Sequence, residues 1–196
     1  MDKDFNKLYL QGKIISKIPF AKNMILTEIF ITENVFIKVM FKENKTKLLD
    51  EYKIGDYINV IAHLRTAQVN KNERYIKENR YIAEDVNKII SIADVISVEN
   101  KNSHPLTFSE FHVKGEVVQL SKSNNGTNRT YILIKTEPEK GNFNYYISLC
   151  VFSTNLNIII GKKYDFTGDI QTWIDKKDGK RTTKAENVVT NIREVE

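Results

Sequence analysis

The chain repeats itself once, and glycines mark the repeat. Residues 8–15 (LYLQGKII) align with residues 111–118 (FHVKGEVV), and glycine falls on glycine. Residues 55–66 (GDYINVIAHLRT) align with residues 161–172 (GKKYDFTGDIQT) without a gap, with the glycines and threonines in register. An ordered internal repeat indicates that one supersecondary unit is built twice. The 196-residue chain is therefore predicted to fold as two similar halves.

Period-two alternation of apolar and polar residues predicts five strands in each half. The first half has them at about 8–18, 24–32, 35–42, 57–66 and 74–87. The second half has them at about 111–121, 129–137, 143–152, 163–173 and 180–192. Asn125-Gly126 and Asp178-Gly179 predict tight hairpin turns between neighbouring strands.

A helix is predicted between the third and fourth strands of each half. It spans residues 44–53 in the first half, and residues 153–160 give a shorter candidate in the second. Three strands, a helix and two strands is the order of the OB-fold, a small five-stranded barrel. We therefore predict an all-β protein made of two tandem OB-folds, each a Greek-key barrel with a short helix between strands three and four. The expected domains are 1–90 and 109–196, joined by a linker at 91–108.

Composition limits the class of protein. The chain has 30 basic and 25 acidic residues, a net charge of +5 and a pI of about 9.1, which fits a polyanionic partner without requiring one. Cys150 is the single cysteine, so no intrachain disulfide can form and a reducing compartment is expected. The polar N-terminus and the lack of a long apolar run predict a soluble, cytoplasmic protein that does not enter membranes.

Catalytic motifs are missing from the sequence. His63, His104 and His112 are scattered and do not have metal-ligand spacing. The glycines are dispersed, so they form no phosphate-binding loop. Cys150 is expected to pack as a small side chain beside the binding face. We predict a protein that is not an enzyme, with no catalytic residue, no metal and no cofactor.

Two stretches of the sequence carry a further signal: residues 6–14 (NKLYLQGKI) and residues 166–189 (FTGDIQTWIDKKDGKRTTKAENVV). The first looks like the first strand, and the second like the fourth strand, hairpin loop and fifth strand, of the bacterial single-stranded DNA-binding protein family. Both halves therefore resemble that family. The resemblance implies single-stranded DNA as the ligand and assembly into groups of four OB-folds. This chain departs from the family in having two folds instead of one.

An OB-fold binds single strands on the outer face of strands two and three and on the loop between strands four and five. Bases stack on aromatic side chains there, and cations follow the phosphates. In the second half, residues 145–152 (YYISLCVF) put three aliphatic side chains on the core face and the other side chains outside. The predicted contacts of this half are Arg129, Tyr131, Lys135, Tyr146, Ser148, Phe152, Trp173, Lys177, Lys180 and Arg181.

The first half carries a weaker pattern of the same kind. Its third strand exposes either Phe36 and Lys38 or, after a shift of one residue, Phe41. Glu28 and Glu33 on or beside strand two would repel phosphate. The predicted contacts of this half are Phe36, Lys38, Arg65, Arg74 and Tyr75, and the last three also fit an ordinary solvated rim.

Together these features favour non-catalytic binding of single-stranded DNA in replication, recombination or repair. Two alternatives stay open: an OB-fold interaction module that contacts replication proteins in a primosome-type complex, or an RNA-binding protein. Two arrangements of the folds are also open. A homodimer would assemble four folds through exposed first strands, or the two halves of one chain would pair with each other.

Overall fold

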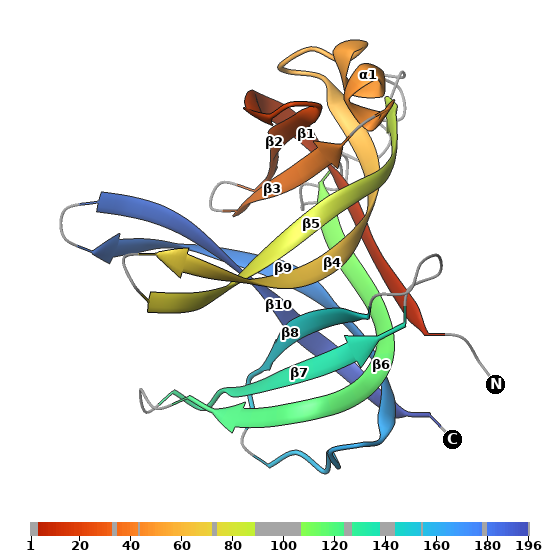
Figure 1. Ribbon diagram of the computed structural model, residues 1–196, viewed down its shortest axis with the longest axis vertical. Helices are drawn as coiled ribbons and strands as arrows, with labels where there is room; N and C mark the ends of the chain where they lie inside the picture. Colours follow the sequence, from red (N-terminus) through yellow and green to blue (C-terminus); the bar gives the residue numbers. More distant parts are fainter. Residues whose placement is uncertain are drawn as a thin grey trace, which may run out of the picture.

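The computed structural model describes residues 4–32, 35–42, 44–71, 74–88, 107–123, 127–137, 144–153, 155–177 and 180–195. Within these residues the chain forms ten strands and one short helix (Figure 1). The first half contains β1 (Phe5–Ala21), β2 (Met24–Thr32), β3 (Val35–Lys42), α1 (Asn44–Asp50), β4 (Tyr57–Lys71) and β5 (Arg74–Lys88). The second half contains β6 (Phe108–Lys122), β7 (Thr130–Thr136), β8 (Tyr145–Val151), β9 (Lys163–Lys177) and β10 (Lys180–Glu194). The all-β prediction is confirmed.

Each half closes into a small barrel. In the first half, β1 pairs with β2 and β4, β2 pairs with β3, and β5 pairs with β4 and, in parallel, with β3. In the second half, β6 pairs with β7 and β9, β7 pairs with β8, and β10 pairs with β9 and, in parallel, with β8. Both rings have the strand order 1-2-3-5-4 of the OB-fold.

The repeat seen in the sequence recurs in the backbone. A bulge at Ile15 interrupts the pairing of β1 with β2, and a bulge at Val118 interrupts the pairing of β6 with β7. A second bulge leaves Glu84 unpaired opposite β4, and its counterpart leaves Thr190 unpaired opposite β9. These positions are equivalent in the alignment of the two halves. Since a bulge changes the twist of a strand locally, the two barrels bend at matching places.

The first strands of the two halves pair with each other. β1 runs antiparallel to β6, and Leu8 lies opposite Phe111, its own equivalent in the repeat. A residue that meets its equivalent marks a local two-fold axis, as in a symmetric dimer interface. The first strands of the two halves, which were expected to pair with a second chain in a homodimer, therefore pair with each other within one chain. Of the two arrangements, the pairing of the two halves of one chain is the one found, and the homodimer stays an untested prediction.

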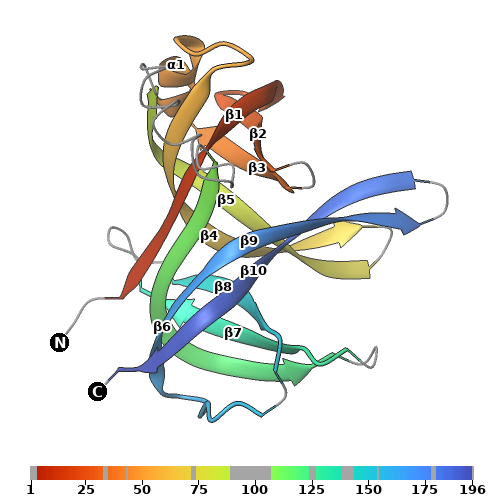
Figure 2. The ribbon, with the colours of Figure 1, turned by 180° about the vertical axis from the view of Figure 1, so that it is seen from behind.

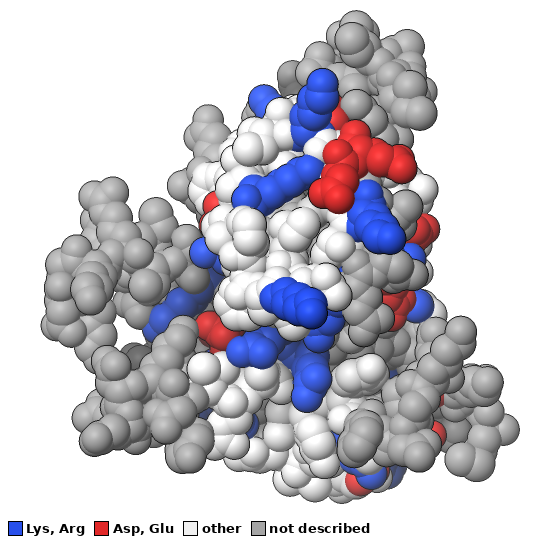
Figure 3. All heavy atoms as spheres, turned by 45° about the horizontal axis from the view of Figure 1, so that its top comes forward, with Lys and Arg blue, Asp and Glu red and all other residues white. Residues whose placement is uncertain are grey.

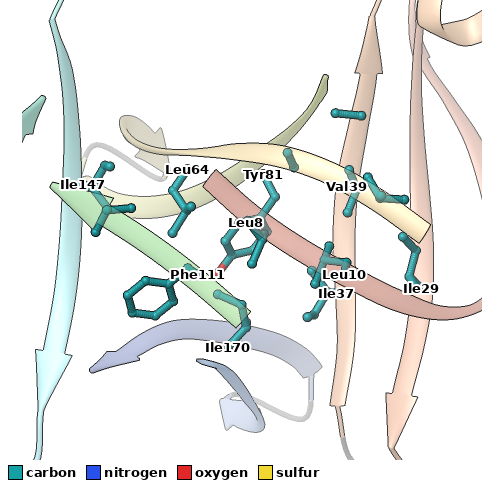
Figure 4. Packing of buried hydrophobic residues seen from close by; sticks show 14 of the residues in the cluster. Leu8, Leu10, Ile29, Ile37, Val39, Leu64, Tyr81, Phe111, Ile147 and Ile170 are labelled. Atoms are coloured by element: carbon teal, nitrogen blue, oxygen red, sulfur yellow. The ribbon is translucent and has the colours of Figure 1, made fainter. Parts of the chain in front are cut away.

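The core is continuous across this junction. Buried residues of both halves belong to one hydrophobic cluster, and Leu8 and Phe111 are fully buried at its centre (Figure 4). Leu10 and Ile37 extend the cluster into the first barrel, and Ile170 extends it into the second. Burial of apolar surface across the junction couples the stability of the two halves.

A second contact joins the two long hairpins, β4–β5 and β9–β10, which project from the same side of the molecule (Figures 1 and 2). The hydroxyl of Tyr81 on β5 lies 3.0 Å from Oδ1 of Asn187 on β10, and both residues are buried. Nδ2 of Asn187 donates to the carbonyl of Ser148, and the Ser148 N–H donates to Oγ1 of Thr66 at 2.7 Å. Buried polar groups that satisfy one another fix a specific arrangement. The first half therefore covers the edge of β8.

The helix predicted at 153–160 is wrong, because residues 155–160 form no helix. Three successive isoleucines, from Ile158 to Ile160, lose side-chain freedom in a helix, and asparagine favours turns. The N–H of Ile159 instead donates to the hydroxyl of Tyr164 at 3.0 Å. In the first half the predicted helix exists but ends at Asp50.

The predicted domain limits stay a prediction, since most of the linker lies outside the described residues. In the part of the chain that the structure describes, no helix is long and apolar enough to cross a bilayer.

Candidate nucleic-acid interface

The outer face of β7 and β8 carries the residues that the sequence singled out. Ile147, Leu149 and Val151 of β8 point into the barrel and are buried, as predicted. On the opposite face Tyr146 is 46% exposed, and Phe152, directly after the strand, is 50% exposed. Aromatic side chains this exposed on a sheet face are not part of the core, and their rings are available for stacking.

Cations lie beside both aromatic side chains. Lys135 on β7 is the direct cross-strand neighbour of Tyr146 on β8. The guanidinium carbon of Arg129 lies 4.8 Å from the ring centroid of Phe152, which is a cation–π contact. The outer face therefore offers an aromatic ring next to a positive charge at both ends of β8.

A carboxylate that sequence reasoning missed lies between these groups. Oε2 of Glu186 on β10 is 3.3 Å from Nη1 of Arg129, and the hydroxyl of Tyr131 donates to Oε1 of Glu186 at 3.0 Å. Burial, followed by this hydrogen bond, raises the pKa of Tyr131, so its hydroxyl keeps its proton and can donate. Arg129, Tyr131 and Glu186 thus form one network on the outer face.

Cys150 lies beneath this network, opposite Tyr131, and is buried. Burial, followed by the nearby charge of Glu186, raises the pKa of the Cys150 thiol to about 12. The expectation that Cys150 packs as a small side chain beside the outer face is consistent with this position.

The thiol of Cys150 is expected to be nearly inert in the folded protein. A rise in pKa from 9.0 to about 12 lowers the thiolate fraction about 1000-fold, and the thiolate is the reactive form. Alkylation by iodoacetamide at pH 8 should be at least about 100-fold slower in the folded protein than in urea. Similar rates in both states would show that the thiol is exposed.

Trp173 belongs to the same side of the β9–β10 hairpin as Glu186. Gln171 lies opposite Glu186, and Trp173, two residues further along β9, lies opposite Lys184. Residues two apart in a strand share a face, so Trp173 extends the surface formed by Arg129 and Tyr131. Trp173 is 37% exposed. For Lys177, Lys180 and Arg181 the structure describes the backbone alone, near the end of this hairpin.

Ser148 lies on the outer face of β8, and its backbone also contacts the first half. Its N–H donates a hydrogen bond to Oγ1 of Thr66, and its carbonyl accepts one from Nδ2 of Asn187. Its backbone therefore belongs to the contact between the halves. Its side chain is half-buried on the outer face. It therefore joins the predicted face to the first half, and its role as a DNA contact stays a prediction.

In the first half the aromatic ring and the cation on the outer face are already engaged with other side chains of that half. Phe41 is fully buried, so the register that exposes Phe36 and Lys38 is the one found. Phe36 packs against Phe30, with ring centroids 5.6 Å apart. Nζ of Lys38 is 3.1 Å from Oε1 of Glu28.

Glu28 is held in its charged form. The hydroxyl of Ser16 donates to Oε2 of Glu28 at 2.7 Å and lowers the pKa of that carboxyl, and Lys38 lowers it further. The charge of Lys38 is thus already balanced. Arg65 is exposed on β4, and for Arg74 and Tyr75 the structure describes the backbone of β5 alone.

The charge over the molecule is mixed. On the face in Figure 3, Lys and Arg side chains are spread from the top to the middle, and Asp and Glu side chains gather in smaller groups. Among the described residues, no three His, Cys, Asp or Glu side chains are grouped to hold a metal ion.

The strand pairings give two five-stranded barrels in one chain, each with the strand order of the OB-fold. No protein-family model matches the sequence, and no curated protein matches it. The chain is similar in structure to the single-stranded DNA-binding protein from Thermus aquaticus, with a TM-score of 0.65 and 10% identity over 100% of this chain and 95% of that one. A deletion mutant of the same Thermus protein gives a TM-score of 0.63 and 12% identity, covering 100% and 96% of the two chains. At these identities the likeness is one of fold.

Proposed function

We propose that the protein binds single-stranded DNA without catalysing a reaction, in replication, recombination or repair. The observation that carries this proposal is the outer face of β7 and β8, where Tyr146 and Phe152 are exposed beside Lys135 and Arg129. Aromatic rings stack on unpaired bases, and the cations neutralise the phosphates between them. A duplex hides its bases within the stack, so this arrangement favours single strands.

The fold supports the same ligand. OB-folds bind oligonucleotides on the outer face of strands two and three and on the loop between strands four and five. In this chain those elements are β7, β8 and the β9–β10 hairpin that carries Trp173. The Thermus aquaticus protein of similar fold is a single-stranded DNA-binding protein.

The two halves are proposed to contribute unequally. Arg129, Tyr131 and Lys135 precede or lie on β7. The equivalent positions of the first half hold Met24, Leu26 and Phe30, which carry no charge. Since phosphate neutralisation supplies much of the affinity for nucleic acids, we place most of it in the second half.

Titration with oligo-dT is expected to quench the fluorescence of Trp173 and to saturate, whereas duplex DNA should bind much more weakly. The logarithm of the affinity should fall with the logarithm of the salt concentration, with a slope of about −0.7 for each phosphate contacted. Oligo-rU serves as the third ligand. Tighter binding of oligo-rU would favour the RNA alternative, and the absence of binding to both oligonucleotides would favour the protein-interaction module.

A further inference from the structure

One carboxylate occupies the middle of the proposed DNA-binding face. Glu186 contacts both Arg129 and Tyr131, and its side chain is 15% exposed. Arg129 in turn covers the ring of Phe152. Three of the groups predicted to bind DNA are therefore engaged with one another and with an acidic residue before any ligand arrives.

We propose that Glu186 is an affinity-determining residue of this face, which holds Arg129 in an ion pair that a DNA phosphate has to displace. The inference rests on the proposed binding of single-stranded DNA. In the free protein the guanidinium of Arg129 is directed to Glu186. When DNA binds, the phosphate takes this guanidinium and Glu186 is left without its cation.

The geometry explains why the exchange is costly. A phosphate close enough to bond Arg129 also approaches the carboxylate 3.3 Å away, and the two negative charges repel each other. This repulsion is stronger than in bulk water because Glu186 is largely shielded from solvent, which lowers the effective dielectric constant. The ion pair thus opposes phosphate binding twice, by occupying the cation and by repelling the anion.

The same contacts affect stacking on Phe152. The guanidinium lies over one side of the ring at 4.8 Å, so a base has to stack on the opposite side or move Arg129. Arg129 therefore links the phosphate contact to the base contact, and Glu186 controls both by holding Arg129 in place.

The substitution Glu186→Gln separates the charge from the hydrogen bond. The amide oxygen of glutamine still accepts the hydrogen bond of Tyr131, whereas the ion pair with Arg129 is lost. We expect E186Q to bind oligo-dT about three- to fivefold more tightly at low salt, the range of a partly exposed ion pair. The salt slope should become steeper by about 0.7, which corresponds to one more phosphate contact.

Two further variants make the test specific. Glu194→Gln removes the same charge from the exposed pair of Glu194 with Lys162 at the C-terminal end of β10, so it measures the effect of net charge alone. Arg129→Met removes the guanidinium and keeps an aliphatic side chain near Phe152. The effect of E186Q is measured in the wild-type chain and in the R129M background.

The inference is supported if E186Q tightens binding more than E194Q and if this gain is absent in the R129M background. It is overturned if E186Q binds no better than E194Q, or if the gain persists without Arg129. Failure of the wild-type chain to bind oligo-dT would instead refute the proposed function itself. Binding by the wild type without the predicted gain would refute the role of Glu186 alone.

Discussion

Truncation of Tyr146 to alanine is expected to weaken the binding of oligo-dT about tenfold or more, whereas Phe36→Ala should change it less than about threefold. The two residues occupy equivalent positions of the repeat, on β8 and β3. Stacking of one base on an aromatic ring contributes about 1–3 kcal/mol, and 1.4 kcal/mol corresponds to a factor of ten. Tyr146 is 46% exposed beside Lys135, so its ring and a cation are both available.

Phe36 lacks both advantages. Its ring packs against Phe30, and the neighbouring cation Lys38 is paired with Glu28. The quenching of Trp173 reports binding in both variants, because neither substitution removes the tryptophan. Urea unfolding of each variant controls for lost stability. Equal losses in the two variants would mean that both halves bind DNA equally, and a larger loss for F36A would reverse the assignment.

The strands were predictable because each barrel buries one face of each strand. Alternation located all ten of them, yet β4 and β9 continue to Lys71 and Lys177, several residues beyond the predicted ends. In these extensions the hairpins project from the barrels (Figure 1), so the apolar pattern ends after Ile174 in β9 and changes phase at Ala67 and Val69 in β4, while the backbone pairing continues. A pattern of side-chain burial cannot indicate a strand that is paired but does not cover a core.

The contact between the halves was harder to predict from the sequence. The residues at its centre, Leu8 and Phe111, appear in the sequence as ordinary core positions of two separate strands. That they face each other depends on how one barrel docks on the other. The contact at the edge of β8 could not be predicted either. The alternation places Ser148 on the outer face, but it does not indicate that the Ser148 N–H donates a hydrogen bond to Thr66 of the first half.

The candidate site was predictable where it depends on a local pattern along one strand, and not where it depends on contacts between distant strands. Aromatic and basic side chains on β7 and β8 follow a local pattern, and the structure brings Arg129, Tyr131 and Phe152 together. Glu186 is 57 residues from Arg129 and acidic, so a search for cations and aromatics passes over it. The signal that could have found it is the position of Glu186 on the fifth strand, which closes the barrel beside the third.

At the junction of the two halves, each of two equivalent cross-strand pairs combines a large side chain with a small residue. Gly168 lies opposite Phe111 in the second half, and Ala62 lies opposite Leu8 at the equivalent place in the first. A Cβ added at Gly168 would lie 2.0 Å from the carbonyl oxygen of Val188 and 2.6 Å from Cζ of Phe111. The Val188 carbonyl and the larger ring of Phe111 together leave no room for a side chain at Gly168.

Gly168→Ala is therefore expected to destabilise the protein by about 3 kcal/mol, because a buried methyl group forces the ring and the backbone of β10 to move. Phe111→Leu alone should cost about 1 kcal/mol through the space it leaves. The double variant copies the Leu8–Ala62 pair of the first half, so it should be more stable than the sum of the single losses predicts, by about 1 kcal/mol. Urea unfolding of the four proteins measures this coupling, and Ala62→Gly is the reciprocal control, with an expected loss of about 1 kcal/mol. Strictly additive losses would show that the clash with the Val188 carbonyl, and not the Phe111 ring, excludes a side chain at Gly168.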